Sequence, residues 1–333
     1  MVEYSDLLIG SIVVVALAFD FMNGFHDAAN SIATIVSTRV LKPQYAVMWA
    51  SFFNFIAFAF FGLHVANTIG RGIIDSSVVD PIVVLAALIA ALFWNVVTWI
   101  YGIPSSSSHA LIGGLIGAAF TKAGVQALEF QGIIKILVSI VLSPLVGFLL
   151  AFLLMGIVSR LLFSLNPARI SSGSRKMQLV SAALYSIGHG GNDAQKTMGI
   201  IAVLLYSSGR MPDGFHVPFW VMWACQIAMA VGTLFGGWRI VETMGLKIAK
   251  LTPLGGTCAE TSGAITLFAA TYLGIPVSTT HTITGSIMGV GAVNKLSAVR
   301  WGVAKNIVWA WVLTIPSTAL ISAVAWYLCQ NLR

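Results

Sequence analysis

Long runs of apolar residues, separated by short polar segments, dominate the chain. Residues 145–155 show the pattern clearly, because every face is apolar except at Gly147. A membrane-barrel strand would alternate apolar and polar positions, so these runs predict helices. In the first half the expected helices are Leu7–Phe21, Asp27–Val40, Tyr45–His64, Ile82–Tyr101, Ala110–Phe120 and Gly132–Val158.

Composition places these helices in a lipid bilayer. The chain is 58% hydrophobic and 9% charged, with a mean hydropathy of +0.91, whereas a soluble domain carries about a quarter charged residues. Lipid tolerates only helices or closed barrels, because no water satisfies the backbone there. We therefore expect an all-α polytopic membrane protein. Its 333 residues leave room for roughly ten crossings of about 20 residues each.

Charge and cysteine usage exclude other classes. The formal net charge is +7, but the basic residues are spread among loops, as the positive-inside bias requires, so no nucleic-acid partner is expected. The three cysteines are widely spaced and show no CxxC pair, which argues against a disulfide framework or a zinc site. The N-terminus lacks the basic segment of a cleaved signal peptide, so the first helix is expected to be retained.

One polar stretch, Asn23–Asn30, interrupts an otherwise apolar region. A carboxylate, an imidazole and two amides there are costly in lipid unless they face protein, water or a solute. A second copy, Gly190–Lys196, shares the pattern G-x-[HN]-D-A-x-[NK] at an offset of 166 residues. Because glycine and asparagine disfavour helix continuation, we expect the first helix to break at Asn23-Gly24.

Other segments repeat in nearly the same register, which indicates an internal duplication. Residues 221–224 repeat 47–50 at offset 174, and residues 274–281 repeat 102–109 at offset 172. The pairs at offset 172 also include Gly113 with Gly285, Gly117 with Gly289 and Pro144 with Pro316. The duplication divides the chain into a first repeat, a basic linker and a second repeat, at residues 1–158, 159–176 and 177–333.

The distribution of charge predicts that the second repeat is inverted. Glu3 and Asp6 suggest that the N-terminus lies outside, whereas the linker, with four basic residues and no acid, suggests the cytoplasm. The basic loop expected at Trp238–Lys250 has a counterpart in the first half that is short of base. Inverted repeats with broken helices that meet at mid-membrane are typical of secondary transporters.

Two segments rich in hydroxyl groups occupy equivalent positions in the repeats. Ser105, Ser106, Ser107 and Ser108 match Val277-Ser278-Thr279-Thr280. The helix at Ala110–Phe120 is too short to cross a bilayer comfortably, so each segment is expected at the tip of a re-entrant helical hairpin. Hydroxyls beside helix N-termini suit a tetrahedral oxyanion, although the same residues could simply cap the helices.

The paired acids, Asp27 and Asp193, look unsuited to an anion site because they are negative. They could hold a co-transported cation, or accept a hydrogen bond from a protonated anion. The second role would favour phosphate over fully ionised sulfate. A structural pair of buried carboxylates is a further reading. An intramembrane aspartyl protease would need the two carboxylates within hydrogen-bonding reach, and would leave the hairpins unexplained. A passive anion channel would never concentrate its substrate.

These motifs resemble the signature of the inorganic phosphate transporter family, sodium- or proton-coupled phosphate permeases. The duplicated G-x-N-D-x-x-N pattern matches residues 24–30 and 190–196, and the paired hairpins match 104–109 and 276–281. The resemblance implies a symporter that imports inorganic phosphate by alternating access. The phosphate would be held between the hairpin tips. It also implies a multi-pass protein of the plasma (inner) membrane, embedded in the lipid bilayer, and a homodimer. It implies neither an enzyme nor a cofactor, and a sulfate permease of the same fold is the alternative.

The resemblance and the motifs together give the expected site residues. The expected substrate-binding residues are Asp27, Ser105, Ser106, Ser107, Ser108, Asp193, Ser278, Thr279 and Thr280. The residues expected to couple transport to a cation or proton are Asn23, His26, Asp27, Asn30, Asn192, Asp193, Lys196 and Glu260. A sodium ion, if used, is expected at Asp27, Asn30 and Asp193.

Three residues depart from the family pattern. His26 replaces the signature asparagine of the first copy, Lys196 replaces the final asparagine of the second, and Asn54 stands where sodium-coupled animal members have an acid. A lysine could supply a fixed positive charge in place of a sodium ion. We therefore expect coupling to protons, with His26 or a carboxylate as the titrating group.

Overall fold

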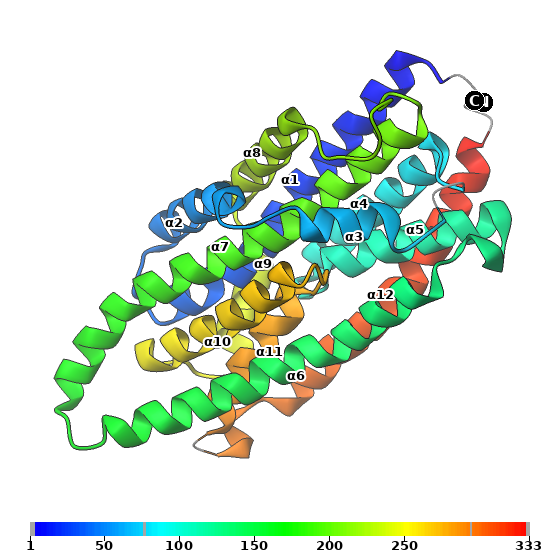
Figure 1. Ribbon diagram of the computed structural model, residues 1–333. Helices are drawn as coiled ribbons and strands as arrows, with labels where there is room; N and C mark the ends of the chain where they lie inside the picture. The colour runs from blue at the N-terminus through cyan, green and yellow to red at the C-terminus, as the bar shows by residue number, and fades with distance from the viewer. Residues whose placement is uncertain (1–3, 76–77, 294, 331–333) are drawn as a thin grey trace.

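The computed structural model describes residues 4–75, 78–293 and 295–330. Helices make up almost the whole of this part of the chain, which confirms the all-α prediction (Figure 1). The helices of the first half are α1 (Asp6–Ser37), α2 (Pro43–Ile56), α3 (His64–Arg71), α4 (Pro81–Tyr101), α5 (Ser107–Ala123) and α6 (Phe130–Leu161). Those of the second half are α7 (Pro167–Ser207), α8 (Phe219–Phe235), α9 (Trp238–Glu242), α10 (Pro253–Tyr272), α11 (Thr279–Ala292) and α12 (Trp301–Cys329).

The two halves repeat the same order of helices with opposite orientation. Arg210, just after α7, forms an ion pair with Asp6 at the start of α1. At the other end of the molecule, Arg175 near the start of α7 donates to the Arg39 carbonyl just after α1, at 2.7 Å. Helices α1 and α7 therefore run antiparallel (Figure 1). The inverted repeat is as predicted, although Glu3, part of that argument, lies outside the described residues.

The break expected at Asn23-Gly24 is absent, because α1 is continuous from Asp6 to Ser37. Gly24 serves instead for close helix crossing: a Cβ there would lie 2.1 Å from the Met229 carbonyl oxygen of α8. Gly190 plays the same part on the continuous α7, where a Cβ would lie 2.5 Å from the Asn54 carbonyl oxygen of α2. The glycines of both signatures therefore let helices from opposite halves approach.

The broken helices lie in the second element of each repeat. Residues 43–59 meet 64–70 at a bend of 82°, and residues 219–235 meet 238–247 at 64°. The second bend falls at Gly236, whose φ of +65° favours glycine, and Gly237, which packs against the α1 backbone. The segment Trp238–Lys250, expected as a loop, is therefore largely helical.

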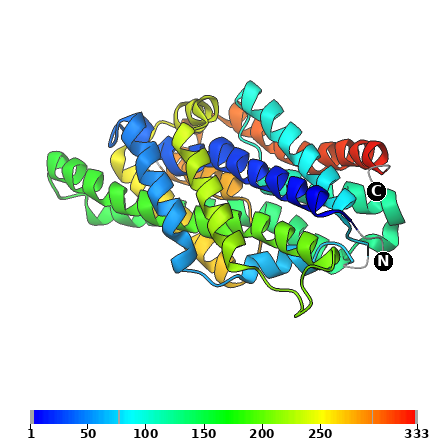
Figure 2. The same ribbon diagram turned by 90° about the horizontal axis from the view of Figure 1, so that it is seen from above.

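Fewer helices than expected suit a simple membrane crossing. Within the described residues four are long and apolar enough, α1, α4, α6 and α12, or up to six spans if each bent pair counts as one. Helices α1, α6 and α7 are far longer than the roughly 20 residues assumed for each crossing. Helix α7 runs along the bundle among the other helices (Figure 2), and many of its buried residues are polar.

The connection between the halves is shorter than expected. Helix α6 ends at Leu161 and α7 begins at Pro167, so only residues 162–166 are non-helical within the linker assigned to 159–176. Asn166 caps α7 by accepting from the Ala168 amide at 2.8 Å, and proline is favourable in the first helical turn. Local capping therefore starts the helix ten residues earlier than the basic composition suggested.

Both expected hairpins are present. In the first, Lys122 at the end of α5 donates to Asp80 at the start of α4 at 2.9 Å. The end of the second arm therefore lies beside the start of the first, as a hairpin requires. In the second, a Cβ on Gly255 of α10 would lie 2.9 Å from a Val290 methyl group of α11. The arms meet at tips that follow Gly102 and Gly274, with φ of +63° and +67°.

Each hairpin packs against the last helix of the other half. A Cβ on Gly117 of α5 would lie 2.0 Å from the Ala319 carbonyl oxygen of α12, and one on Gly285 of α11 would lie 2.1 Å from that of Pro144 in α6. The close contacts of these glycines therefore cross between the halves. Because each hairpin packs on the other half, both tips are held at the centre of the molecule.

Candidate functional site

Lys196 joins the two hairpin tips at the centre of the molecule. Its side chain is buried and donates to the Ser108 hydroxyl of the first tip at 2.5 Å and to the Val277 carbonyl of the second at 2.7 Å. Its third partner is the Asp193 carboxylate, one helical turn earlier on α7. The ammonium group has three donors, so all three are satisfied.

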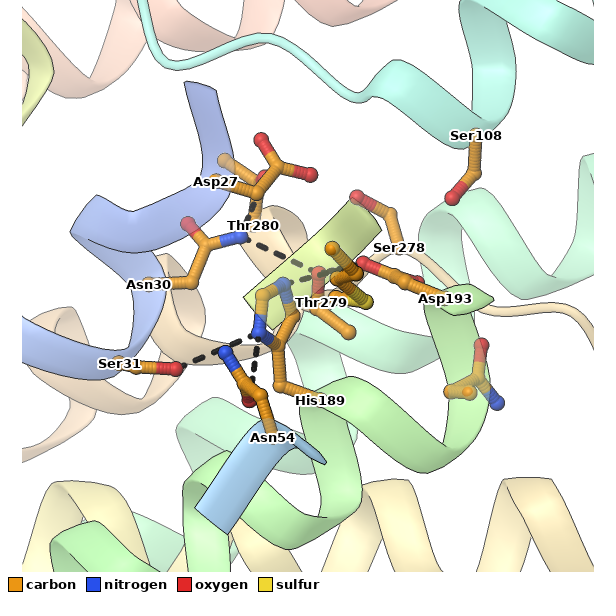
Figure 3. A network of polar contacts seen from close by, with 12 residues as sticks. Asp27, Asn30, Ser31, Asn54, Ser108, His189, Asp193, Ser278, Thr279 and Thr280 are labelled. Atoms are coloured by element: carbon orange, nitrogen blue, oxygen red, sulfur yellow. Dashed lines mark hydrogen bonds and ion pairs between the residues drawn. The ribbon is translucent and has the colours of Figure 1, made fainter. Parts of the chain in front are cut away.

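Asp193 lies at the meeting point of both repeats. Besides Lys196, its carboxylate accepts from the Thr279 hydroxyl at 2.8 Å and lies 3.3 Å from the His189 Nε2 atom. The carboxylate is fully buried, and a buried carboxylate is tolerated only when it is paired and hydrogen-bonded. The predicted placement of Asp193 beside the second tip is therefore what the structure shows (Figure 3).

His189 was not identified from the sequence. Its Nδ1 atom lies 3.2 Å from the Asn54 side-chain oxygen and 3.3 Å from the Ser31 hydroxyl, while Nε2 faces Asp193 (Figure 3). The available signal was its position four residues before Asp193, which places both on one face of a helix. Asn54, the sequence departure noted above, thus contacts the imidazole that lies beside Asp193.

Asn30 brings the first signature to the second tip. Its Nδ2 atom donates to the Thr279 and Thr280 hydroxyls at 3.1 and 3.0 Å (Figure 3). Its side-chain oxygen is buried and has no hydrogen-bond partner among the described residues. Asn30 and Lys196 occupy equivalent positions in the two repeats. The Asn30 amide contacts only the second tip among the described residues, whereas Lys196 contacts both tips.

Asp27 pairs with its neighbour in sequence. The His26 Nδ1 atom lies 2.7 Å from the Asp27 Oδ1 atom, and His26 Nε2 lies 2.9 Å from the Thr98 hydroxyl of α4. All three side chains are buried. Thr98 was also missed from the sequence, because it lies within an apolar run and only the fold brings it to His26.

The tip hydroxyls do not all face the same way. Ser105 bonds Thr314 of α12 at 2.8 Å, away from Lys196, so its predicted part in the site is not supported by its contacts. Ser106 and Ser278 accept from the amides three residues ahead at 3.2 Å, so they cap α5 and α11. The Ser107 hydroxyl is buried and has no partner among the described residues.

Two expected coupling residues, Glu260 and Asn23, lie apart from the tips, and a third, Asn192, reaches only the backbone at the start of the second tip. Glu260 of α10 accepts from Thr34 and Ser181 at 2.5 Å each and from Gln178 at 3.0 Å, and none of these belongs to a tip. Asn192 donates to the Thr271 hydroxyl at 2.9 Å and to the Ile275 carbonyl, next to Gly274, at 3.3 Å. Asn23 is buried on α1, and its side-chain oxygen lacks a partner among the described residues.

The site offers one group of side chains that could hold a cation. One ligand atom each from Asp27, His189 and Asp193 lie within 4.8 Å of one another. This group contains both acids predicted for sodium, with His189 beside them. Asn30 stands one turn from Asp27, and its free oxygen could contribute. Lys196 already neutralises one oxygen of Asp193, which weakens the attraction for a further cation.

The geometry as a whole suits an oxyanion. Helices α5 and α11 both begin at the tips, so their free amide groups and partial positive charges converge where Lys196 lies. Hydroxyl groups of Ser107, Ser108 and Thr280 add donors, and the nearby carboxylates can accept hydrogen bonds. Sequence reasoning found the acids and the tips, whereas the contacts of His189, Thr98 and Ser31 needed the fold.

Comparison with known proteins identifies related sequences. A family model described as the phosphate transporter family matches residues 23–172 and 165–322. A protein of Rhizobium meliloti named "Probable low-affinity inorganic phosphate transporter" is 66% identical over 96% of both chains, and one of the same name in Bacillus subtilis is 48% identical over 95% of this chain and 96% of its own.

A solved structure is also similar. A protein titled "The sodium-dependent phosphate transporter" superposes with a TM-score of 0.87 at 26% identity, covering 98% of this chain and all of the other. The names describe transporters, the class expected from the sequence. With both halves matched by the family model and two-thirds identity to a full-length relative, the chain belongs to the phosphate transporter family.

Proposed function

We propose that this protein is a secondary active symporter that imports inorganic phosphate across the plasma (inner) membrane by alternating access. One observation carries the proposal: two hairpin tips from inverted halves meet on the buried pair of Lys196 and Asp193. A site between inverted repeats can open to either side when one part rocks against the other. The printed names of the relatives support phosphate as the substrate.

The residues around the tips have separate parts in this proposal. Ser107, Ser108 and Thr280, with the amides at the starts of α5 and α11, donate to phosphate oxygens. Lys196 supplies the fixed positive charge. Asp27 and Asp193 accept from the hydroxyl of a protonated phosphate, which fully ionised sulfate lacks. The acids thus act as a filter as well as a counter-charge.

We propose protons as the coupling ion. Lys196 fills the position in which the first repeat has Asn30, and its ammonium already bonds an Asp193 oxygen that a sodium ion would need. The pair of His26 and Asp27 places an imidazole in contact with a carboxylate on the first signature. A homodimer, which the family resemblance implies, stays a prediction.

Sodium is the second candidate, and a specific observation favours it. Asp27, His189 and Asp193 place three ligand atoms within 4.8 Å of one another, and the unpaired oxygen of Asn30 lies on the same helix as Asp27. The similar solved structure is titled as sodium-dependent. A protease, by contrast, finds no support in the names of the relatives.

Uptake into proteoliposomes tests the proposal. Radiolabelled phosphate is offered with a proton gradient alone, a sodium gradient alone, or neither, and with a protonophore as the control. Proton-coupled symport predicts accumulation with the proton gradient and its loss with the protonophore. Uptake that requires sodium and ignores the protonophore would reject proton coupling, while mere equilibration under every gradient would indicate a channel.

Competition in the same vesicles tests the substrate. Arsenate keeps a proton near neutral pH as phosphate does, and should compete, whereas sulfate should not. Strong competition by sulfate would show that the acids do not select the protonated anion, and would favour the sulfate permease.

A further inference from the structure

Asp20 is a buried acid on α1 that the proposed site does not use. Its side chain is fully buried, and one oxygen, Oδ1, accepts from the Thr197 hydroxyl of α7 at 2.9 Å. The other oxygen, Oδ2, has no hydrogen-bond partner among the described residues. A charged carboxylate that has only neutral groups as hydrogen-bond partners is costly away from water.

The other buried acids of the membrane helices are much better compensated. Asp193 has Lys196 and the Thr279 hydroxyl, Asp27 has His26, and Glu260 accepts from three donors. The polar side chains beside Asp20, those of Thr197, Asn23 and Cys225, are all neutral, and no basic side chain lies within ion-pair distance in the described part of the chain. Its surroundings therefore suit a neutral carboxyl group.

A second unpaired acceptor lies one helical turn away. Asn23 is three residues after Asp20, on the same face of α1, and is a polar neighbour of its carboxyl group. The Asn23 Oδ1 atom is buried and also lacks a partner among the described residues. A proton on Asp20 Oδ2 would make this oxygen a hydrogen-bond donor, and the Asn23 oxygen one turn away is an acceptor of the kind it needs.

The arrangement exists in one half only. The equivalent of Asp20 in the second repeat is Ser186, whose hydroxyl donates to the Ala182 carbonyl of its own helix at 2.8 Å. Asp20 instead bonds across the halves, to the residue that follows Lys196 on α7. An inverted repeat that carries an acid in one half treats the two sides of the membrane differently.

We propose that Asp20 is the site that binds and releases the coupling proton. The inference rests on the proposed proton-coupled transport and adds the residue that carries the proton. The proton binds to Oδ2 and leaves to water when that side of α1 is hydrated. No covalent bond other than the O–H bond forms or breaks.

The charges around Asp20 explain how the proton and phosphate are coupled. From α7, Asp193 acts on it by charge repulsion, and Lys196 lies beside Asp193. From α8, the Cys225 thiol is its titratable neighbour. On α1 itself the nearest titratable pair is His26 and Asp27, while α4 contributes no charged residue. An anion bound beside Asp193 adds negative charge, so it favours a proton on Asp20, and the proton favours the anion in return.

Replacing Asp20 with asparagine tests the assignment. The amide keeps an oxygen for Thr197 and offers an N–H to Asn23, so Asp20→Asn imitates the protonated form permanently. Two rates are measured in proteoliposomes: exchange of labelled for unlabelled phosphate without gradients, and accumulation driven by a pH gradient. We expect exchange close to that of the wild type and a loss of accumulation of about tenfold or more. Ser186→Ala, at the equivalent position, is the control and should retain both activities.

Each outcome decides a different claim. Gradient-driven accumulation by Asp20→Asn at the wild-type level would overturn the assignment while leaving symport intact. A wild type that accumulates phosphate only with sodium would overturn proton coupling and Asp20 with it. A wild type that exchanges no phosphate would reject the proposed function itself.

A second variant covers the case in which Asp20→Asn fails to fold. Thr197→Val removes the hydroxyl that stabilises the charged carboxylate but leaves the acid in place. The half-maximal pH of accumulation should then move toward higher pH, because the proton is held more tightly. An unchanged pH profile would contradict the assignment.

Discussion

Replacing Lys196 with methionine removes the contact that joins the two tips while keeping a side chain of similar length. The ammonium makes three hydrogen bonds, to Ser108, Val277 and Asp193, and the carboxylate left behind is fully buried. Breaking a buried ion pair by removing one partner costs about 3–5 kcal/mol, since the other charge is left uncompensated. Lys196→Met should therefore destabilise the protein by that order and abolish phosphate exchange.

The double variant with Asp193→Asn provides the matched control. Removing both charges together avoids the uncompensated charge, and replacing a whole buried pair is often near neutral. The double variant should thus unfold at a higher temperature in detergent than Lys196→Met alone, although it too should not transport. A double variant whose loss of stability equals the sum of the losses in the two single variants would refute this role of the lysine. Phosphate exchange at the wild-type rate by Lys196→Met would refute it as well.

Further substitutions test the helix crossing, the acid and the cap. Gly24→Ala should lower the unfolding temperature in detergent by the equivalent of about 1–3 kcal/mol, because its Cβ would lie 2.1 Å from the Met229 carbonyl oxygen. Gly10→Ala is the control, since a Cβ there would have nothing within 4 Å, and it should not lower the unfolding temperature. Equal unfolding temperatures of the two variants would contradict the close crossing at Gly24. Asp27→Asn should abolish accumulation without loss of membrane insertion, since a neutral amide is easier to bury; normal accumulation would remove Asp27 from the site. Ser106→Ala should weaken phosphate affinity and helix α5 together, by about 1 kcal/mol for the lost cap, measured by binding and thermal unfolding; unchanged values would show that its hydroxyl contributes to neither.

The sequence predicted the fold class, the duplication and its inversion, because these depend on apolar length, charge bias and repeated glycines and prolines. It predicted a helix break at the wrong position, Asn23-Gly24. Gly24 and Asn23 read locally as helix breakers, yet a glycine inside a helix can equally permit a close crossing, as it does against Met229. Only the neighbouring helix distinguishes the two, and local sequence does not name that neighbour.

The site shows the same limit. Asp27, Asp193 and the tip hydroxyls were found because they recur in both repeats. His189 was missed because its equivalent is an asparagine, Asn23, so the repeat gave no matching histidine. Ser105 was included because it stands beside true tip residues, although its hydroxyl turns to α12. The direction of a side chain at a tip depends on how the hairpin arms pack. The neighbouring residues in the sequence do not determine that packing.

A crystal of the protein grown with arsenate tests the central claim most directly, because the arsenic atom can be located by its anomalous scattering. The account predicts one site between the two hairpin tips, within hydrogen-bonding distance of Ser108, Thr280 or the first amides of α5 and α11, and beside Lys196. Arsenic bound away from the tips, with none between them, would contradict it.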